Sequence, residues 1–136
     1  MDMSHADAFL ASLELAAERC EDIVPPVYAE LFKRFPEMEA LFVLDVDDGV
    51  KGHMLNESLS MAEGLLADDL VATSFIAAER MNHSGNGVDD PTFNGYYPVL
   101  RDVIQSLAGA EWTAEMETAW NEVIERASAA NLEAMG

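Results

Sequence analysis

His83 is the residue of this sequence whose type and position best suit a metal ligand. It is the first residue of the tract HSGNGVDDPTFNG, whose Gly, Asn, Asp and Pro residues are expected to end a helix immediately after it. An imidazole nitrogen is a frequent ligand of transition metals, and at a helix end it can point into a slot between helices. A histidine in such a place is, however, more often a helix-terminal residue with a satisfied hydrogen bond. The position alone leaves both roles open.

Other common kinds of chemistry find no support in the residue pattern. The sequence contains no recognisable nucleophilic triad, phosphate-binding glycine loop or zinc-ligand spacing. Asp and Glu follow the solvent faces of the expected helices, and no pair of them suggests general acid–base catalysis. A haem iron needs one strong axial ligand, an apolar slot between helices and few polar groups near its vacant coordination position. The chain can supply all of these.

The elements that must position such a site are helices. Apolar residues recur at helical spacing over most of the chain, and runs of Val, Ile and Thr typical of strands are missing, which predicts an all-α protein. We expect one domain over residues 1–136, with helices at about 4–20, 25–36, 50–66, 69–82, 97–107 and from 113 onward, a short turn at 36–42 and an acidic loop at 45–49.

Polar and proline residues mark where several of these helices begin. Ser4 and Thr113 are expected to cap the first and last helices, because their hydroxyl oxygens can accept from free backbone N–H groups. Pro25 and Pro26 cannot lie deep inside a helix, so the second helix is expected to start there.

Composition limits the partners. The formal net charge is −19, from 26 acidic and 7 basic side chains, which disfavours nucleic acid and anionic membrane surfaces. We interpret the charge as a solvated acidic coat, with a docking face for a basic redox partner as the alternative. Cys20 is the single cysteine, and the N-terminal residues do not resemble a signal peptide, so we expect a cytoplasmic protein.

Five short segments carry a family resemblance that extends over nearly the whole chain. They are YAELFKRFPEMEALF (28–42), KGHMLNESL (51–59), HSGNGV (83–88), YYPVLRDVI (96–104) and AW (119–120). Their order and spacing resemble the globin family, and in particular its single-domain bacterial haemoglobins. The resemblance implies a globin fold, a three-over-three helical sandwich, holding one haem b, with His83 as the iron ligand. The haem would be held non-covalently, because the chain has no Cys-x-x-Cys-His tract.

The same resemblance implies the other residues of the haem pocket. Tyr28 would donate a hydrogen bond to a gas bound at the iron, and Phe42 would stack on the porphyrin. Lys51 occupies a position where the family usually has His or Gln, and we expect it to swing outward toward a haem propionate. Ligation of iron by a deprotonated Lys51 is the alternative. The remaining implied haem contacts are Leu55, Leu59, Val88 and Tyr97.

Departures from the family pattern leave further alternatives. A register slip of two or three residues would bring His53 or Met54 over the haem in place of Lys51. Glu79 lies four positions before His83, where the family usually packs an apolar residue. Its carboxylate would increase the imidazolate character of His83 if it reached the ring, but we expect it to point outward. The loop between Val88 and Tyr97 is longer than in the bacterial relatives.

The function implied by the resemblance is reversible binding of dioxygen, nitric oxide or carbon monoxide, for storage, delivery, scavenging or sensing. One alternative is nitric oxide dioxygenation with a separate reductase, because the sequence carries no flavin or nicotinamide domain. Another is a haem-free, globin-like module for signalling or pigment binding. This alternative stays open because Glu79 and Lys51 put charged side chains below and above the presumed haem.

Overall fold

The computed structural model describes residues 4–45, 48–85 and 87–130, and within these ranges it contains helices and no strand. The elements are α1 (His5–Arg19), α2 (Val24–Arg34), the 3-10 helix η1 (Pro36–Phe42), α3 (Gly49–Leu66), α4 (Leu70–Gly85), α5 (Asp90–Asn94), α6 (Tyr96–Ala108), the 3-10 helix η2 (Gly109–Glu111) and α7 (Ala114–Ala129). The prediction of an all-α protein is confirmed.

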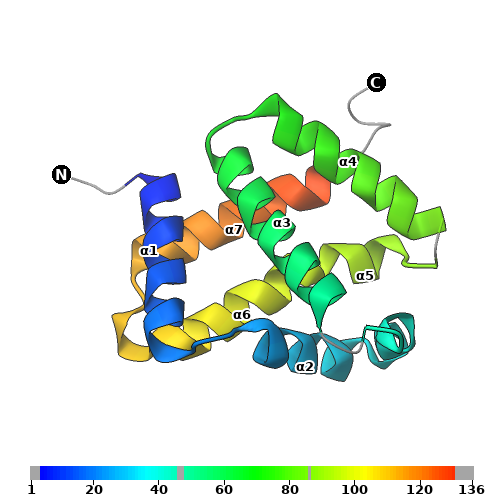
Figure 1. Ribbon diagram of the computed structural model, residues 1–136. Coiled ribbons are helices and arrows are strands. Elements are labelled where there is room, and N and C mark those ends of the chain that lie inside the picture. Colours follow the sequence, from blue (N-terminus) through cyan, green and yellow to red (C-terminus); the bar gives the residue numbers. More distant parts are fainter. Residues whose placement is uncertain (1–3, 46–47, 86, 131–136) are drawn as a thin grey trace.

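The helices pack in two crossed layers. One layer holds α1, α3 and α4, and the other holds α2, α6 and α7 (Figure 1). Between the layers, α1 contacts α6 and α7, and α3 contacts α2 and α7; within the layers, α3 contacts α4, and α2 contacts α6. The arrangement is a three-over-three helical sandwich.

Helix starts follow the predicted capping residues. The hydroxyl of Ser4 accepts from the N–H of Asp7 at 3.1 Å at the start of α1, and that of Thr113 accepts from the N–H of Met116 at 3.1 Å at the start of α7. Pro residues occupy the first turn of α2, where a missing N–H costs nothing. These three predictions are confirmed.

The carboxylate of Asp45 organises the start of α3. It accepts from the N–H of Val50 at 2.9 Å and from that of Lys51 at 3.0 Å. The N–H of Val50 lowers the pKa of Asp45 most, and the N–H and ammonium of Lys51 lower it further against the opposing effect of burial. Of the predicted acidic loop at 45–49, residues 46 and 47 lie outside the described ranges, and Gly49 already belongs to the helix.

The chain around His83 differs from the prediction in two ways. Helix α4 continues two residues past His83, to Gly85, so the expected break immediately after His83 is wrong. The turn comes at Gly87, whose φ of 91° suits glycine, and the N–H of Val88 closes it on the carbonyl of His83 at 2.8 Å. The expected loop then contains α5, which Asp89 caps by accepting from the N–H of Thr92 at 3.1 Å.

Helices α3 and α4 are in close contact at Gly64. A Cβ atom at Gly64 would lie only 2.7 Å from the Cβ of Ala72, so the missing side chain allows the contact. From their connecting turn the two helices diverge (Figure 1). Arg126 of α7 holds this turn, because its guanidinium donates to the carbonyl of Leu65 and to the carboxylate of Asp68.

A polar link lies in the core between α1 and α7. The indole N–H of Trp120 donates to the hydroxyl of Ser12 at 2.9 Å, and Ser12 donates to the carbonyl of Phe9 at 2.6 Å. All three side chains are fully buried, and the rings of Phe9 and Trp120 pack with centroids 4.9 Å apart. Both buried polar groups are thus satisfied.

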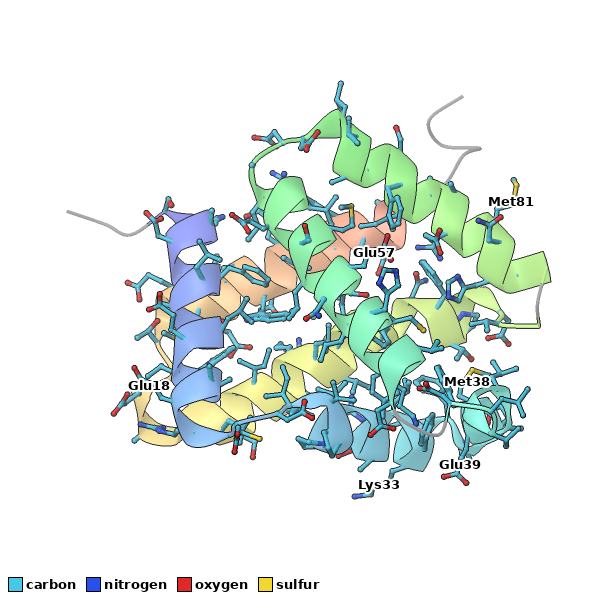
Figure 2. All side chains as sticks on the ribbon, viewed as in Figure 1. Glu18, Lys33, Met38, Glu39, Glu57 and Met81 are labelled. Carbon is cyan, nitrogen blue, oxygen red and sulfur yellow. The ribbon has the colours of Figure 1, made fainter. Side chains whose placement is uncertain are left out.

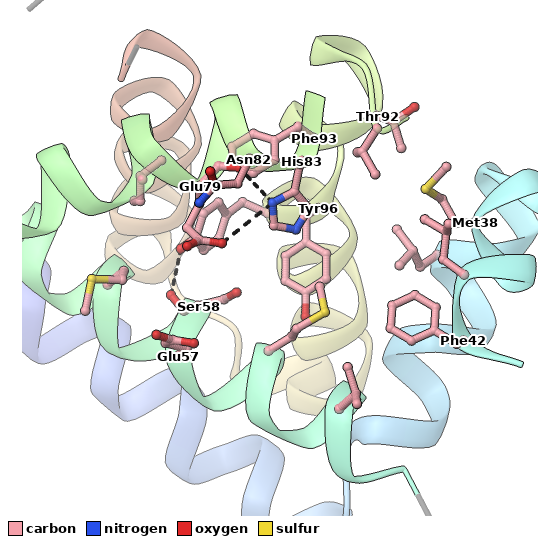
Figure 3. Close-up of a pocket in the computed structure, with 18 of the residues that line it drawn as sticks. Met38, Phe42, Glu57, Ser58, Glu79, Asn82, His83, Thr92, Phe93 and Tyr96 are labelled. Carbon is pink, nitrogen blue, oxygen red and sulfur yellow. Dashed lines mark hydrogen bonds and ion pairs between the residues drawn. The ribbon is translucent and has the colours of Figure 1, made fainter. Parts of the chain in front are cut away.

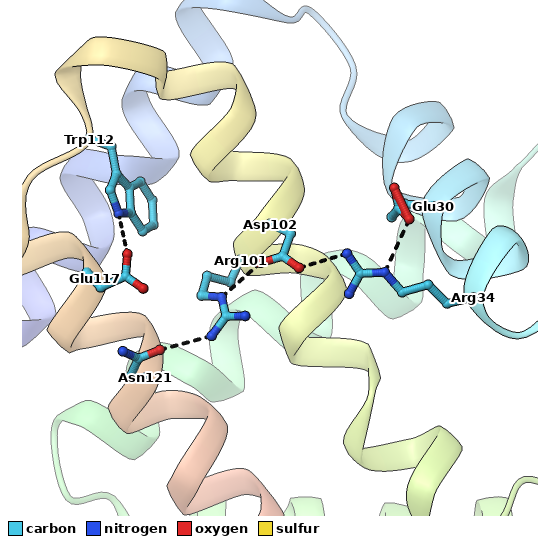
Figure 4. A network of polar contacts seen from close by, with 7 residues as sticks. All are labelled: Glu30, Arg34, Arg101, Asp102, Trp112, Glu117 and Asn121. Atoms are coloured by element: carbon cyan, nitrogen blue, oxygen red, sulfur yellow. Dashed lines mark hydrogen bonds and ion pairs between the residues drawn. The ribbon is translucent and has the colours of Figure 1, made fainter.

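A polar network joins α2, α6 and α7 on the outside of the molecule (Figure 4). Asp102 accepts from Arg34 at 2.7 Å and from Arg101 at 3.0 Å, and Arg101 also donates to Asn121 at 3.0 Å. Burial raises the pKa of Asp102, but the hydrogen bonds from Arg34 and Arg101 outweigh it and hold that pKa below its ordinary value.

Charged side chains cover the exterior. Glu18, Lys33 and Glu39 are exposed and point away from the helices (Figure 2). Cys20, which ends α1, is half-buried, and its thiol contacts the carbonyl of Asp22 at 3.2 Å. None of the helices within the described ranges is both long and apolar enough to span a membrane.

Candidate functional site

A cavity of about 430 Å³ opens between α3 and α4, where the two helices diverge, and η1, α5 and α6 complete its wall. Its volume is typical of small-molecule and cofactor sites. Most of the lining is apolar or aromatic: Leu31, Met38, Leu41, Phe42, Val50, Met54, Met61, Phe75, Ile76, Val88, Phe93, Tyr96 and Tyr97. The polar lining residues are Glu57, Ser58, Glu79, Asn82, His83 and Thr92.

His83 presents its imidazole to this cavity from α4 (Figure 3). Its Nδ1 atom lies 2.7 Å from the carbonyl oxygen of Glu79, one helical turn earlier. A carbonyl oxygen can only accept, so Nδ1 is the donor and carries the proton. In the neutral ring, Nε2 then keeps its lone pair, which is the form of histidine that binds a metal.

The carboxylate of Glu79 is turned toward the same ring. Its Oε2 atom lies 3.7 Å from Nδ1 of His83, and Glu79 is among the residues that line the cavity. The expectation that Glu79 points outward into the acidic coat is therefore wrong. The i,i+4 spacing on one helix places both side chains on the same face, which explains the contact.

Aromatic and cationic neighbours fix the end of α4. The ring of Phe93 in α5 meets the imidazole of His83 edge-on, with centroids 5.3 Å apart. The guanidinium of Arg80 lies 4.7 Å from the centroid of Phe93 and donates to the carbonyls of Ala127 and Ala130 at 2.8 and 2.9 Å. Arg80 thereby ties α4 to the end of α7 and positions the segment that carries His83.

The opposite wall of the cavity is one face of α3. Val50, Met54, Ser58 and Met61 lie on this face at helical spacing and line the cavity. The predicted contact Leu55 is 2% exposed in the core, and it lines a second cavity of about 500 Å³, between α1 and α3, together with Leu59.

The structure therefore does not bring Leu55 and Leu59 together with His83. Met54, which the sequence suggested only as a register alternative, occupies the cavity side of α3 instead.

The two other candidates for iron ligation on α3 lie away from the cavity lining. The ammonium of Lys51 is 3.0 Å from the carboxylate of Asp48 and 5.6 Å from the ring centroid of Phe42. Lys51 is thus held beside Phe42 at the start of α3. His53 is exposed, and its Nε2 atom lies 3.0 Å from the carboxylate of Glu57.

Three tyrosines gather beside the cavity. Tyr96 and Tyr97 line it, whereas Tyr28 is buried behind them, with its hydroxyl 2.8 Å from that of Tyr96 and 3.2 Å from the carbonyl of Lys51. The hydroxyl of Tyr97 donates to the carbonyl of Ser58 at 2.7 Å. Burial raises the pKa of Tyr96 to about 12 and raises the pKa of Tyr28 and Tyr97 further, so all three remain neutral hydrogen-bonding groups.

Some of the residues that the sequence suggested line the cavity, and other lining residues were not suggested. His83, Phe42, Val88 and Tyr97 all line the cavity, as the resemblance implied. The residues that it missed are mainly methionines and aromatics: Met38, Met61, Phe75, Phe93 and Tyr96. Tyr96 directly precedes the predicted Tyr97, and the helical spacing of Met54 and Met61 was the signal that could have identified the α3 wall.

The lining fits a flat apolar group held by a single nitrogen donor. Apart from Glu57 and Glu79, the described polar residues of the cavity are Ser58, Asn82, Thr92 and His83, none of them a carboxylate. Nowhere in the described part of the chain do three or more His, Cys, Asp or Glu side chains cluster so as to hold a bare metal ion. A haem, whose porphyrin supplies the other iron ligands, would need one axial donor from the protein, and His83 is the imidazole in this lining.

Comparison with known proteins agrees with the resemblance. The family model described as Globin matches residues 26–130, which is more than half of the chain and extends from within α2 through α7. Neither the search of curated proteins nor the search of solved structures found a match.

Proposed function

Because this chain belongs to the globin family, whose members typically hold haem and bind a diatomic gas, we propose that it holds haem b between α3 and α4 and binds dioxygen, nitric oxide or carbon monoxide reversibly. The haem would supply an iron atom with one coordination position open to the gas. Storage, delivery, scavenging and sensing all follow from such binding.

One observation carries the proposal: the hydrogen bond from Nδ1 of His83 to the carbonyl of Glu79 at 2.7 Å. It fixes the tautomer whose free Nε2 can bind iron, and it does so in a side chain that faces an apolar cavity. A histidine that merely ends a helix can make the same hydrogen bond, so the support for a ligand comes from this tautomer together with the apolar cavity that the ring faces.

The surrounding residues would hold the porphyrin and exclude water. We propose that Phe42, Val88, Tyr97, Met54 and Met61 contact the haem, because all of them line the cavity.

Lys51 would pair with a propionate by exchanging its contact with Asp48, which lies 3.0 Å away. Leu55 and Leu59 would support α3 from behind, since they face the second cavity.

The tyrosine pair would provide the polar contact to the gas. Tyr96 lines the cavity and donates to Tyr28, which donates to the carbonyl of Lys51. We propose that Tyr28 turns its O–H from Lys51 to Tyr96 when a gas is bound, which frees the O–H of Tyr96 to donate to the gas. If the protein consumes nitric oxide, a separate reductase would have to return the iron to the ferrous state. Repeated nitric oxide consumption that depends on an added reductase would distinguish the enzyme from the carrier.

Titration of the purified chain with hemin tests the proposal. We expect a Soret band that saturates near one haem per chain, and a ferrous form that binds carbon monoxide. His83→Ala should remove the iron–histidine signature and weaken haem retention, because the cavity lining then lacks its imidazole.

His53→Ala is the matched control, because His53 is exposed and absent from the cavity lining, and it should behave as the wild type. A wild-type chain that forms no Soret band would instead be a haem-free module. An unchanged His83→Ala spectrum would place the iron ligand elsewhere.

A further inference from the structure

We propose that Glu79 is a positioning residue that holds a negative charge beside His83 and thereby favours the oxidised form of a haem iron bound to that histidine. The proposal rests on the haem binding proposed above. It concerns a residue at whose position the resemblance described above implies an apolar side chain.

Both oxygen-bearing groups of Glu79 face the same ring nitrogen. Its carbonyl oxygen lies 2.7 Å from Nδ1 of His83, and its carboxylate Oε2 lies 3.7 Å from that atom. The carbonyl sets the tautomer and orientation of the ring. The carboxylate adds a full negative charge next to the N–H group, which a leucine or valine at this position could not do.

The surroundings preserve the effect of this charge. The side chains of His83 and Glu79 are 29% and 37% exposed, respectively, and an apolar cavity lies on one side of them, so solvent screens the pair less than it would on the open surface. Within the described ranges, the ion pair of Glu79 is with His83 and not with a lysine or arginine. Among the residues that the structure describes, no lysine or arginine neutralises this carboxylate.

Neighbouring elements keep the ring in this orientation. The edge-on contact of Phe93 with His83, at 5.3 Å between centroids, limits rotation of the imidazole. Arg80 anchors the same turn of α4 by donating to the carbonyls that end α7. The charge of Glu79 thus acts on a ligand whose geometry is already determined.

A carboxylate near the second nitrogen of a ligating histidine makes the ligand more basic. A more electron-rich imidazole stabilises ferric iron more than ferrous iron. Removal of the charge is therefore expected to raise the midpoint potential and to weaken the iron–imidazole bond of the ferrous form.

The test is a redox titration of the hemin-loaded full chain, with dithionite as reductant and dye indicators, on wild type and Glu79→Gln. At the potential where the wild type is half reduced, Glu79→Gln should show a severalfold higher ferrous-to-ferric ratio. Resonance Raman spectra of the ferrous form should show the iron–histidine stretch at a lower frequency.

Two further variants sharpen the test. Glu63→Gln removes one negative charge from an exposed position on α3, away from the cavity lining, and should match the wild type in both measurements. Glu79→Asp keeps the charge but withdraws it by one methylene, and should fall between wild type and Glu79→Gln. If Glu79→Gln cannot retain haem, the midpoint potential and iron–histidine frequency of Glu79→Asp are compared with those of Glu63→Gln. A shift in Glu79→Asp alone supports the role of Glu79, and equal values contradict it.

The outcomes separate this proposal from the proposed function. If the wild type binds haem through His83 but Glu79→Gln and Glu63→Gln give the same potential and the same iron–histidine frequency, the role of Glu79 is wrong and the function stands. If the wild type forms no haem complex, the proposed function fails first and the role of Glu79 fails with it.

Discussion

The hydroxyl oxygens of Tyr28 and Tyr96 lie 2.8 Å apart beside the cavity. The hydroxyl of Tyr28 also lies 3.2 Å from the carbonyl oxygen of Lys51, which can only accept. Tyr28 therefore donates to Lys51, and Tyr96 donates to Tyr28. This chain of two hydrogen bonds connects α6 to α2 and α2 to the start of α3.

Tyr28→Phe and Tyr96→Phe should be coupled in their effects on stability. Tyr28→Phe leaves the donor of Tyr96 and the carbonyl of Lys51 without their partner, and should lower the free energy of unfolding by about 1–3 kcal/mol. Tyr96→Phe removes only a donor and should lower the free energy of unfolding by less than Tyr28→Phe does. The measurement is urea unfolding of the wild type, the two single variants and the double variant. The double variant should lose about 1 kcal/mol less free energy of unfolding than the two single variants lose together. Additive losses would contradict the hydrogen bond.

Stability should decrease in alkaline solution because of the same side chains. The three tyrosines of the sequence ionise at an ordinary pKa of 10.0, whereas burial raises the pKa of Tyr96 to about 12 and those of Tyr28 and Tyr97 further. The unfolded chain then loses protons that the folded chain retains, so stability present below pH 10.0 is lost as the pH rises toward 12. Tyrosinate absorbance should increase together with the loss of helical circular dichroism. A tyrosinate transition near pH 10.0 in a fully helical protein would contradict the burial of these hydroxyls.

Arg80→Met should destabilise the protein far more than a surface arginine does. Arg80 is 7% exposed and donates to the carbonyls of Ala127 and Ala130 at the end of α7, which methionine would leave without those donors. We expect a loss of about 2–4 kcal/mol in chemical denaturation, because charged hydrogen bonds and buried acceptors are both lost. Arg34→Met is the comparison, because its ion pairs are partly exposed, and should cost roughly 1 kcal/mol or less. Equal losses would contradict the anchoring role of Arg80.

Alanine should have opposite effects at two glycines of α3. At Gly52 a Cβ meets no described atom within 4 Å, so Gly52→Ala should stabilise the helix by about 0.5–1 kcal/mol. At Gly64 the Cβ would lie 2.7 Å from the Cβ of Ala72 and would push α3 and α4 apart, at a cost of about 1–3 kcal/mol that exceeds the helix gain. Thermal unfolding of the two variants measures the difference. A stabilised Gly64→Ala protein would contradict the close approach.

Helix starts were predictable because local chemistry determines them. Ser4 and Thr113 accept from backbone N–H groups three residues later, an interaction that depends on neighbours in the chain. The end of α4 depends on more distant contacts. Gly87 makes the turn and Phe93 packs on His83, so the helix extends past the point where the Gly- and Asn-rich composition suggested a break.

The face of α3 that lines the cavity could not be read from periodicity. This helix is apolar on two sides, with Leu55 and Ala62 in the core and Met54 and Met61 toward the cavity. Both stripes repeat at helical spacing, and only the positions of α1, α4 and α7 around the helix distinguish them. The orientation of Glu79 was missed for a similar reason, because an acidic residue on a highly acidic chain looked like part of the surface.

Three of the side chains that line the cavity, Met38, Met54 and Met61, are unbranched thioethers that come from two different elements, η1 and α3. Each has three rotatable bonds and a polarisable sulfur, so it can change shape at little energetic cost. Rotamer changes of these methionines can therefore adapt the cavity wall to a flat ligand, while the helices that bear them stay in place.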